Sequence, residues 1–134
     1  MNATVNEAGT TPVGTAARTF RIEEITTPDG LARLAPAWQA LSRHVDNALL
    51  FNSYEWASAC WRHFHAAAPR RDARLCVLAI WHDAKLRGIV PFWIKTKRVF
   101  GFRVRIAHFL GEGPSDYGDL LLDEPRHELL NVVV

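Results

Sequence analysis

The sequence has no apolar run long enough to cross a membrane as a helix. The longest apolar stretches, residues 75–81 and 89–94, have the length of β-strands, whereas a membrane span needs roughly 18 or more residues. Residues 1–18 lack the apolar core and the basic start of a secretory signal. We therefore expect a cytoplasmic protein, with residues 1–18 as a disordered leader, because threonine, alanine, glycine and asparagine offer little apolar surface to bury.

Cysteine is also scarce, with only Cys60 and Cys76 in the chain. Neither belongs to a C-x-x-C pair, so we predict no disulfide framework. The six histidines are scattered and form no Cys/His cluster with ligand spacing, so we predict no metal site. Both cysteines lie among apolar residues, and we interpret them as small buried side chains in a reducing compartment.

Excess charge is nearly absent as well, because 16 basic and 14 acidic residues leave a net charge of +2. This balance by itself indicates no polyanionic partner. The charges are unevenly placed, however: residues 85–105 hold seven basic residues and no acid, whereas residues 112–128 hold six acids and one arginine. The basic stretch fits either solvated strand edges and a hairpin tip or a patch for an anionic group, such as a phosphate, a membrane surface or a nucleic acid.

The sequence does contain clear periodic patterns. Residues 19–26 alternate apolar and polar side chains and predict a first strand. Thr27, Pro28 and Asp29 predict the start of a helix, since threonine caps, proline suits the first helical position and aspartate favours the positive end of the helix dipole. This helix has one apolar stripe, made of Leu31, Leu34, Ala35, Trp38, Leu41 and Val45.

A second helix is predicted from residue 52 or 53 to the region before Pro69. Its cap is either Asn52, with Glu55 three residues later as in a capping box, or Ser53. The predicted apolar face consists of Tyr54, Ala57, Trp61 and Phe64. The five tryptophans of the chain fall on or beside helical stripes or on predicted strands, and we assign all five to the core.

Strands follow the two helices. Residues 73–81 are apolar on both faces, as expected inside a covered sheet. Residues 86–95 return after a turn as the hairpin partner. Pro91 has no N–H to donate to a ladder, so it marks a bulge or an edge-facing position.

Further strands are predicted at residues 105–110 and 119–122, and residues 126–134 begin a helix or a strand. The prediction is one α/β (α+β) domain over residues 19–134, with two N-terminal helices and a mixed, largely antiparallel sheet. Residues 129–134 form an apolar run without a cap or a polar tail, so we expect the fold to be incomplete at this end.

The glycine loop, residues 111–119 (GEGPSDYGD), carries the densest set of polar groups. Its Ser115, Asp116 and Tyr117 offer a nucleophile, a base and a hydrogen-bonding acid, although the same residue types build ordinary turns. The loop does not match a phosphate-binding G-x-G-x-x-G or Gly-Lys-Ser/Thr pattern. His108 is the histidine nearest to this loop in the sequence, and it fits either a structural or a site role.

Several of these segments together resemble a known family. They are Phe51-Asn-Ser-Tyr-Glu-Trp56, the hairpin ending Gly88-Ile-Val-Pro-Phe92, the basic stretch after it, and Phe109-Leu-Gly-Glu-Gly-Pro-Ser-Asp-Tyr-Gly-Asp119. From about Phe20 to Val134 the chain resembles the N-terminal half of GNAT-type acetyltransferases of the CelD-like, cellulose-biosynthesis kind, which are distant relatives of the FemABX aminoacyltransferases. The last segment is the most specific part of the resemblance.

The resemblance implies a GNAT-like fold of two halves, in which acetyl-CoA is the co-substrate and binds the second half. A GNAT site holds the CoA pyrophosphate with an Arg/Gln-x-x-Gly-x-Gly/Ala signature at a helix N-terminus, and this chain does not contain that signature. We therefore assign no catalytic and no cofactor-binding residue. Ser115, Asp116, Tyr117 and His108 are the candidates for contacts with the acceptor substrate or with the other half.

The expected function is that of the N-terminal portion of an acetyl-CoA-dependent N- or O-acyltransferase in polysaccharide or cell-envelope biosynthesis, inactive alone. Its expected partners are the missing C-terminal half, or another chain at the C-terminal edge, and a small-molecule or glycan acceptor. One alternative is a FemABX-like transfer of an aminoacyl group from tRNA to a peptidoglycan precursor. The other is a non-enzymatic binding or regulatory module.

Overall fold

The structure, a computed structural model, describes residues 19–65, 72–111, 120–123 and 126–133. Their element order is β1 (Arg21–Ile25), α1 (Pro28–Ser42), α2 (Tyr54–Cys60), β2 (Ala73–His82), β3 (Lys85–Val99), β4 (Phe102–Phe109), β5 (Leu121–Leu122) and α3 (Arg126–Val133). A 3₁₀ turn, Leu50–Asn52, precedes α2, and a π turn, Trp61–His65, follows it. The predicted order of strands and helices is confirmed, and residues 126–133 form a helix.

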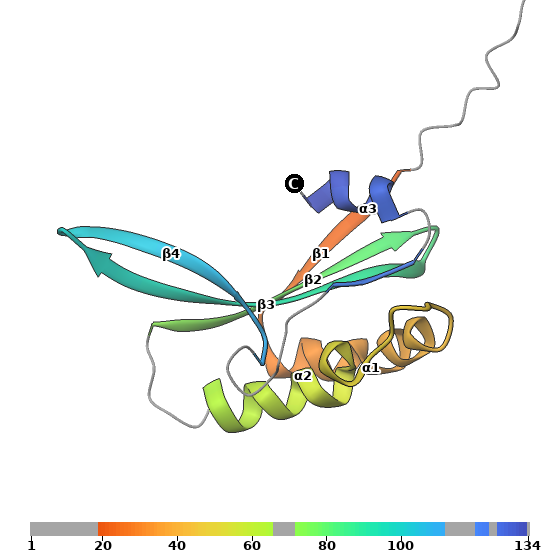
Figure 1. Cartoon of the computed structure of the whole chain (residues 1–134), viewed down its shortest axis with the longest axis horizontal. Helices are drawn as coiled ribbons and strands as arrows, with labels where there is room; N and C mark the ends of the chain where they lie inside the picture. The colour runs from red at the N-terminus through yellow and green to blue at the C-terminus, as the bar shows by residue number, and fades with distance from the viewer. Residues whose placement is uncertain (1–18, 66–71, 112–119, 124–125, 134) are drawn as a thin grey trace, which may run out of the picture.

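One antiparallel sheet organises the described residues (Figure 1). The strand order is β1-β2-β3-β4, and β5 also pairs with β3. Each pairing is antiparallel. The chain is therefore a mixed α+β domain, as the sequence predicts for the coarse fold class.

Helices cover both faces of this sheet, α1 and α2 on one face and α3 on the other (Figure 1). We call these the α1–α2 face and the α3 face. Val77 of β2 and Ile89 of β3 point to the α1–α2 face, where they pack with Leu31, Leu34, Trp38 and Leu41 of α1. Ile80 and Val90 point to the α3 face and pack with Leu129. Because successive residues alternate between faces, the continuous apolar run of a central strand follows directly from burial on both sides.

The start of α1 is the one that the sequence predicts. Thr27 adopts an extended conformation, and its Oγ1 accepts a hydrogen bond from Gly30 N at 3.0 Å. Pro28 is the first helical residue, where its missing N–H leaves no gap in the hydrogen bonding. The helix buries Leu31, Leu34, Trp38 and Leu41, four residues of the predicted stripe.

The second helix differs from its prediction in one side chain. Of the two possible caps, Ser53 is the one used, because its Oγ accepts from Trp56 N at 3.2 Å. The helix ends at Cys60, and the π turn that follows has a wider period than the α-helix. Phe64 is consequently 53% exposed, so its assignment to the apolar face is wrong.

The tryptophans divide into two groups. Trp38 and Trp93 are buried, as predicted. Trp61 and Trp81 are half-buried but pack against the same core, so their assignment is confirmed in part. Trp56 is half-buried and packs on Phe51.

Both strands of the long hairpin β3–β4 extend further towards the turn than predicted. β3 extends to Val99 instead of ending at Lys95, and β4 begins at Phe102 instead of Arg105. Phe100 and Gly101 form the turn, with φ values of 50° and 84°. A two-residue turn with both φ values positive matches the twist of the flanking strands, so the pairing continues to the very tip.

Candidate functional site

The edge of β3 changes partner part-way along its length. β5 pairs with Gly88 and Ile89, and β4 pairs from Phe92 onward. Pro91 lies between these two pairings, and its carbonyl oxygen accepts from Leu110 N at 2.6 Å. In an antiparallel sheet the N–H and C=O of one residue point to the same neighbour, so the N–H that Pro91 lacks would have faced Leu110, just beyond the end of β4.

Proline therefore removes at most one hydrogen bond, at the end of the β3–β4 ladder. The register with β2 is continuous there, and the irregularity of that pairing falls at Ile80 and Trp81 instead. The predicted bulge at Pro91 is thus not found in the β2–β3 pairing. The edge-facing alternative is not confirmed either, because the carbonyl of Pro91 accepts from Leu110 N.

The glycine loop begins and ends at this change of partner. It leaves β4 at Gly111, which has a φ of 92°, a conformation that glycine adopts without strain. The described chain resumes at Leu120, immediately before β5. Ser115, Asp116 and Tyr117 lie outside the described residues. The structure thus locates the two ends of the loop that carries them.

His108 lies on β4 three residues before Gly111. It is directly opposite Trp93 of β3, and the two rings stack with centroids 4.9 Å apart and an angle of 23° between their planes. Trp93 belongs to the core under α1 and α2, and Nε2 of His108 is buried. The imidazole is therefore held in one orientation beside the start of the glycine loop.

The connection between α1 and α2, residues 43–53, contacts the far end of the loop. Asn47 Nδ2 donates to Leu120 O at 2.9 Å. Asn52 holds this connection in shape: its Nδ2 donates to Asn47 O at 2.8 Å, and its Oδ1 accepts from Leu49 N at 2.7 Å. Trp38 Nε1 in turn donates to Asn52 O at 3.0 Å.

Asn52 is the one buried polar side chain among the described residues, with 1% of its surface exposed. A buried amide is tolerated because its donor and acceptor are both used. Sequence patterns predict Asn52 only as a possible helix cap, and they do not predict this network. An Asn-rich connection before a helix is too common a pattern to reveal it.

A basic groove lies on the α3 face of β2, β3 and β4, beyond the area that α3 covers. It has a volume of about 370 Å³ and is lined by Arg74, Ile94, Thr96, Arg103 and Arg105. Register places Thr96 opposite Arg105, so both side chains lie on the same face. The described residues thus include an arginine-lined depression on an open part of the sheet.

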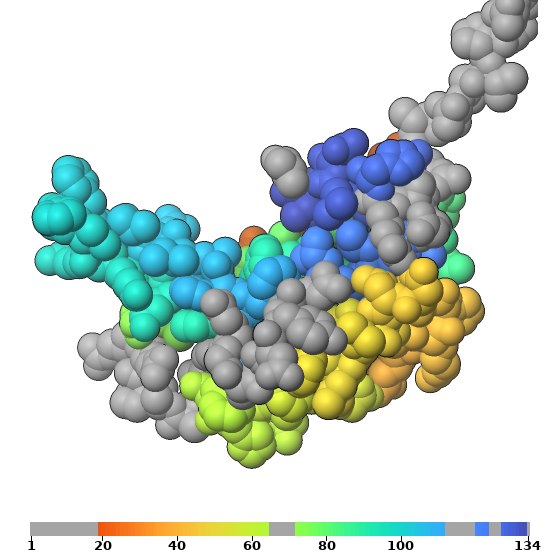
Figure 2. All heavy atoms as spheres, viewed as in Figure 1, coloured from red at the N-terminus to blue at the C-terminus, as the bar shows by residue number. Residues whose placement is uncertain are grey.

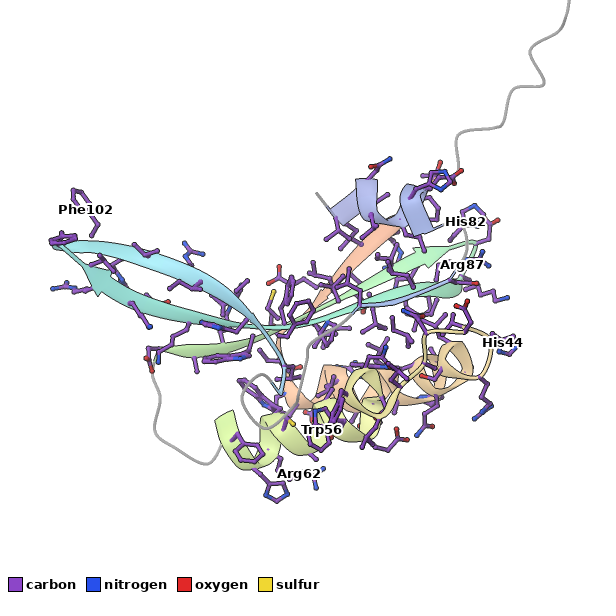
Figure 3. The ribbon with its side chains drawn as sticks, viewed as in Figure 1. His44, Trp56, Arg62, His82, Arg87 and Phe102 are labelled. Carbon is purple, nitrogen blue, oxygen red and sulfur yellow. The ribbon has the colours of Figure 1, made fainter. Side chains whose placement is uncertain are left out.

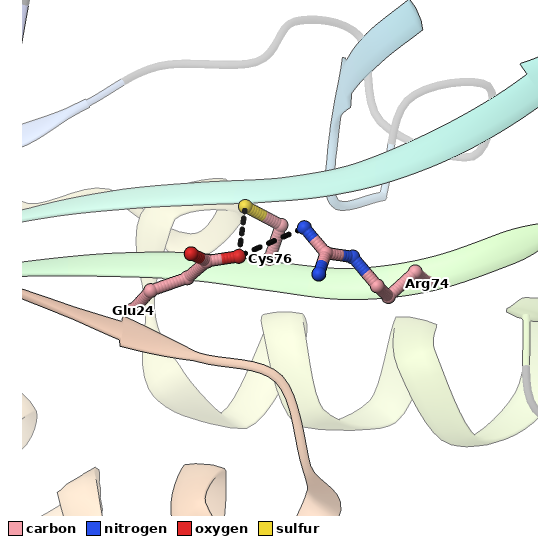
Figure 4. A network of polar contacts seen from close by, with 3 residues as sticks. All are labelled: Glu24, Arg74 and Cys76. Atoms are coloured by element: carbon pink, nitrogen blue, oxygen red, sulfur yellow. Dashed lines mark hydrogen bonds and ion pairs between the residues drawn. The ribbon is translucent and has the colours of Figure 1, made fainter. Parts of the chain in front are cut away.

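Arg74 of this groove is already engaged. It forms an ion pair with Glu24 at 2.9 Å, and the same carboxylate oxygen accepts a hydrogen bond from Cys76 Sγ at 3.6 Å (Figure 4). Burial raises the pKa of the Cys76 thiol, and the negative charge of Glu24 and its hydrogen bond raise this pKa further, whereas Arg74 acts in the opposite direction. Cys76 is therefore a thiol at neutral pH and a poor nucleophile.

A second cavity, of about 220 Å³, lies between the C-terminal end of α1 and the β2–β3 turn. His44 and Lys85 are on its rim, and Leu41 and Trp81 contribute apolar walls. His44 Nδ1 is 2.8 Å from Ala40 O, so a helix carbonyl holds the ring. The walls are mostly apolar, and Asp123 is the third charged or titratable residue of the lining.

The N-terminus of α3 does not fit a pyrophosphate. The segment before it contains Asp123, which pairs with Arg87 at 3.2 Å, and the first turn of α3 contains Glu128. The Glu128 carboxylate would repel an anion, whereas the charge of Asp123 is balanced by Arg87. Within the described parts of the chain, no group of three or more His, Cys, Asp or Glu side chains is placed to hold a metal ion.

Comparison of the chain with protein-family models, curated proteins and solved structures finds no match. In the part of the chain that the structure describes, every helix is too short or too polar to traverse a bilayer. The function therefore has to be argued from the residues of this chain.

Proposed function

We propose that this chain is the N-terminal portion of a cytoplasmic GNAT-family acyltransferase. The reaction is transfer of an acetyl group from acetyl-CoA to an amine or hydroxyl of a glycan acceptor in polysaccharide or cell-envelope biosynthesis. The finer fold assignment, a GNAT-like half-domain, belongs to the same proposal.

One observation carries the proposal: the glycine loop with its Ser115-Asp116-Tyr117 triplet starts and ends where β3 changes partner. The strand-helix-helix-strand-strand-strand order before the loop agrees with the order that the resemblance implies. Glycines let a backbone approach a ligand closely, and the polar side chains of this segment suit an acceptor with hydroxyl or amine groups.

The chemistry that follows is direct attack of the acceptor on the thioester. A base removes the proton of the acceptor, and backbone N–H donors stabilise the oxyanion that develops on the thioester carbonyl. Ser115, Asp116 and Tyr117 are proposed as acceptor contacts, together with His108, which stacks on Trp93. Since α3 does not fit a pyrophosphate, CoA binding falls to the second GNAT-like half, and no catalytic base is assigned in this chain.

The test begins with the protein isolated from its natural host. Its intact mass is compared with the 15.1 kDa of this chain, and release of the CoA thiol from acetyl-CoA is followed with amino-sugar and polysaccharide acceptors. We expect a larger mass and acceptor-dependent CoA release. The matched variants are Asp116→Asn, which should raise KM for the acceptor, and Asp72→Asn directly before β2, which should leave it unchanged.

Two results would overturn the proposal. One is a mass of 15.1 kDa together with no binding of acetyl-CoA in calorimetry. The other is CoA release that does not depend on any amine or hydroxyl acceptor.

Aminoacyl transfer from tRNA is the alternative, and the basic side chains of the β3–β4 hairpin favour it. Contacts to RNA phosphates release counterions, so binding of tRNA should weaken steeply as salt is raised. Salt-dependent tRNA binding together with no CoA release would replace the acetyltransferase proposal by this one.

A further inference from the structure

The end of the β3–β4 hairpin is an exposed apolar tip. Phe100 is 97% exposed and Phe102 is 75% exposed, and Val99 and Val104 beside them are about two-fifths exposed. We call these four residues the hairpin tip. The hairpin projects as an arm beyond both helix layers, and Phe102 stands at its far end, directed away from the body (Figures 2 and 3). Four apolar side chains at the end of a protruding arm are a contiguous patch of the kind that marks an interaction site.

Basic residues surround this tip on both faces of the hairpin. Arg98 lies opposite Arg103 on the α3 face, and Lys97 lies opposite Val104 on the other face. Lys95 and Arg105 follow one step further from the tip. Among the described residues, none of these five side chains forms an ion pair. Residues 85–111 contain no acid, so the charge of the arm is wholly positive.

We propose that the β3–β4 hairpin docks end-on to an anionic lipid surface, with Phe100 and Phe102 inserted below the headgroups. A strand rises about 3.3 Å per residue, so Lys97, Arg98 and Arg103 lie about 7–10 Å behind the turn. Interfacial apolar groups reach about 5–10 Å into the headgroup and acyl boundary. When the phenylalanines reach the acyl chains, the three basic groups are therefore level with the lipid phosphates.

Charge and shape favour a lipid surface over the other partners. A nucleic acid is bound along a positively charged groove with aromatic rings under the bases, but this tip is convex and includes two valines, which cannot stack. A second copy of the chain would bring two wholly positive arms together, and the like charges would repel. A bilayer offers an anionic layer and an apolar layer, separated by about the distance between the basic residues and the phenylalanines of the hairpin.

The experiment is co-sedimentation of the full chain with vesicles of phosphatidylcholine, with and without phosphatidylglycerol. We expect binding only when phosphatidylglycerol is present. Phe100→Ser with Phe102→Ser should lower the partition coefficient by about tenfold or more. Arg98→Gln with Arg103→Gln should lower it by about 25-fold, since each basic group near an anionic surface contributes about fivefold.

Two matched controls test whether binding depends on the side chains of the hairpin or on any exposed apolar or basic side chain of the chain. Leu50→Ser removes an apolar side chain that is 63% exposed but lies in the 3₁₀ turn before α2. Arg62→Gln removes an exposed charge on the π turn. Both variants should bind as the wild type does. All the replaced side chains are exposed, so circular dichroism should show an unchanged fold for each variant.

Four outcomes would overturn the proposal. They are equal binding to vesicles without phosphatidylglycerol, no binding to either vesicle, wild-type binding by the double phenylalanine variant, and a concentration-dependent dimer that this variant abolishes. Binding of tRNA that displaces the vesicles and survives loss of both phenylalanines would assign the arm to nucleic acid instead. The assay contains no acetyl-CoA, so its result does not depend on the proposed acyltransferase activity.

Discussion

Asn47 donates its side-chain amide to the carbonyl oxygen of Leu120 at 2.9 Å, although 73 positions separate the two residues. This hydrogen bond joins the α1–α2 connection to the end of the glycine loop. Asn52 supports it, because its side chain binds the Asn47 carbonyl on one side and the Leu49 N–H on the other. The position of the loop end therefore depends on a segment that precedes it by more than half of the chain.

Asn52→Ala should lower the free energy of unfolding by about 2–4 kcal/mol. The substitution leaves the part-buried Leu49 N–H and Asn47 carbonyl without their partner, and each such group costs about 1–2 kcal/mol. Urea unfolding followed by tryptophan fluorescence measures the change. Gln39→Ala is the control, because the Gln39–Glu55 hydrogen bond is exposed to water and its loss should cost no more than about 0.5 kcal/mol. Equal effects of the two substitutions would contradict the role given to Asn52.

Ala84→Gly should stabilise the protein by about 1 kcal/mol. Ala84 has a φ of 60° in the β2–β3 turn, a left-handed conformation that disfavours a Cβ and suits glycine. The same change at Ala40, an exposed position of α1, should destabilise by about 1 kcal/mol, because glycine is a poor helix former. Thermal unfolding of the two variants should move the midpoint in opposite directions. A lower midpoint for Ala84→Gly would show that the turn is not strained.

Alkylation of Cys76 should respond in opposite directions to two neighbouring substitutions. Burial and the Glu24 charge raise the pKa of this thiol, whereas Arg74 lowers it. Glu24→Gln should therefore speed alkylation by iodoacetamide at mildly alkaline pH, by about threefold, and Arg74→Gln should slow it. Cys60 is the internal control, since burial alone raises its pKa. Peptide mass spectrometry reads both sites in one sample, and a parallel change at Cys60 would indicate general loosening of the fold instead.

Stability should fall as the pH rises above about 9. The pKa of Cys60 and that of Cys76 are raised above the ordinary value of 9.0 in the folded protein. From about pH 9 upward the unfolded chain loses these protons first, so the folded state binds more protons and the free energy of unfolding decreases with pH. The contribution of the two protonated thiols to stability is complete below about pH 9, and it is lost as the pH rises through their pKa values in the folded protein. Urea unfolding between about pH 7 and about pH 10 measures the slope, and Cys76→Ala should make the slope shallower; an unchanged slope would count against a shifted thiol.

Local signals predicted much of the fold. The cap at Thr27, the proline after it and the apolar stripe of α1 act within a few residues, so they can be recognised without the rest of the chain. The run in β2 that is apolar on both faces likewise indicated a sheet covered on both sides. The glycine loop was recognised by composition, although Ser115, Asp116 and Tyr117 lie outside the described residues.

Other features could not be predicted from neighbouring residues. Phe64 follows the helical period of α2 in the sequence, but the π turn directs it outward. The choice between Asn52 and Ser53 as the helix cap depended on whether the Asn52 amide had a better partner elsewhere, and Asn47 and Leu49 supply those partners. The apolar tip at Phe100 and Phe102 lies within a stretch that the sequence marks only as basic.

The sequence by itself determined the elements, their order and the reversal at the two hairpins, because capping, periodicity and turn residues act over a few positions. The tertiary structure alone decided which strand β3 pairs with at each position, and therefore that Pro91 lies at the change of partner. It also decided that Asn47 contacts Leu120 and that Trp93 stacks on His108. The physical reason is that pairings between distant segments depend on which surfaces are left to bury after the local elements have formed.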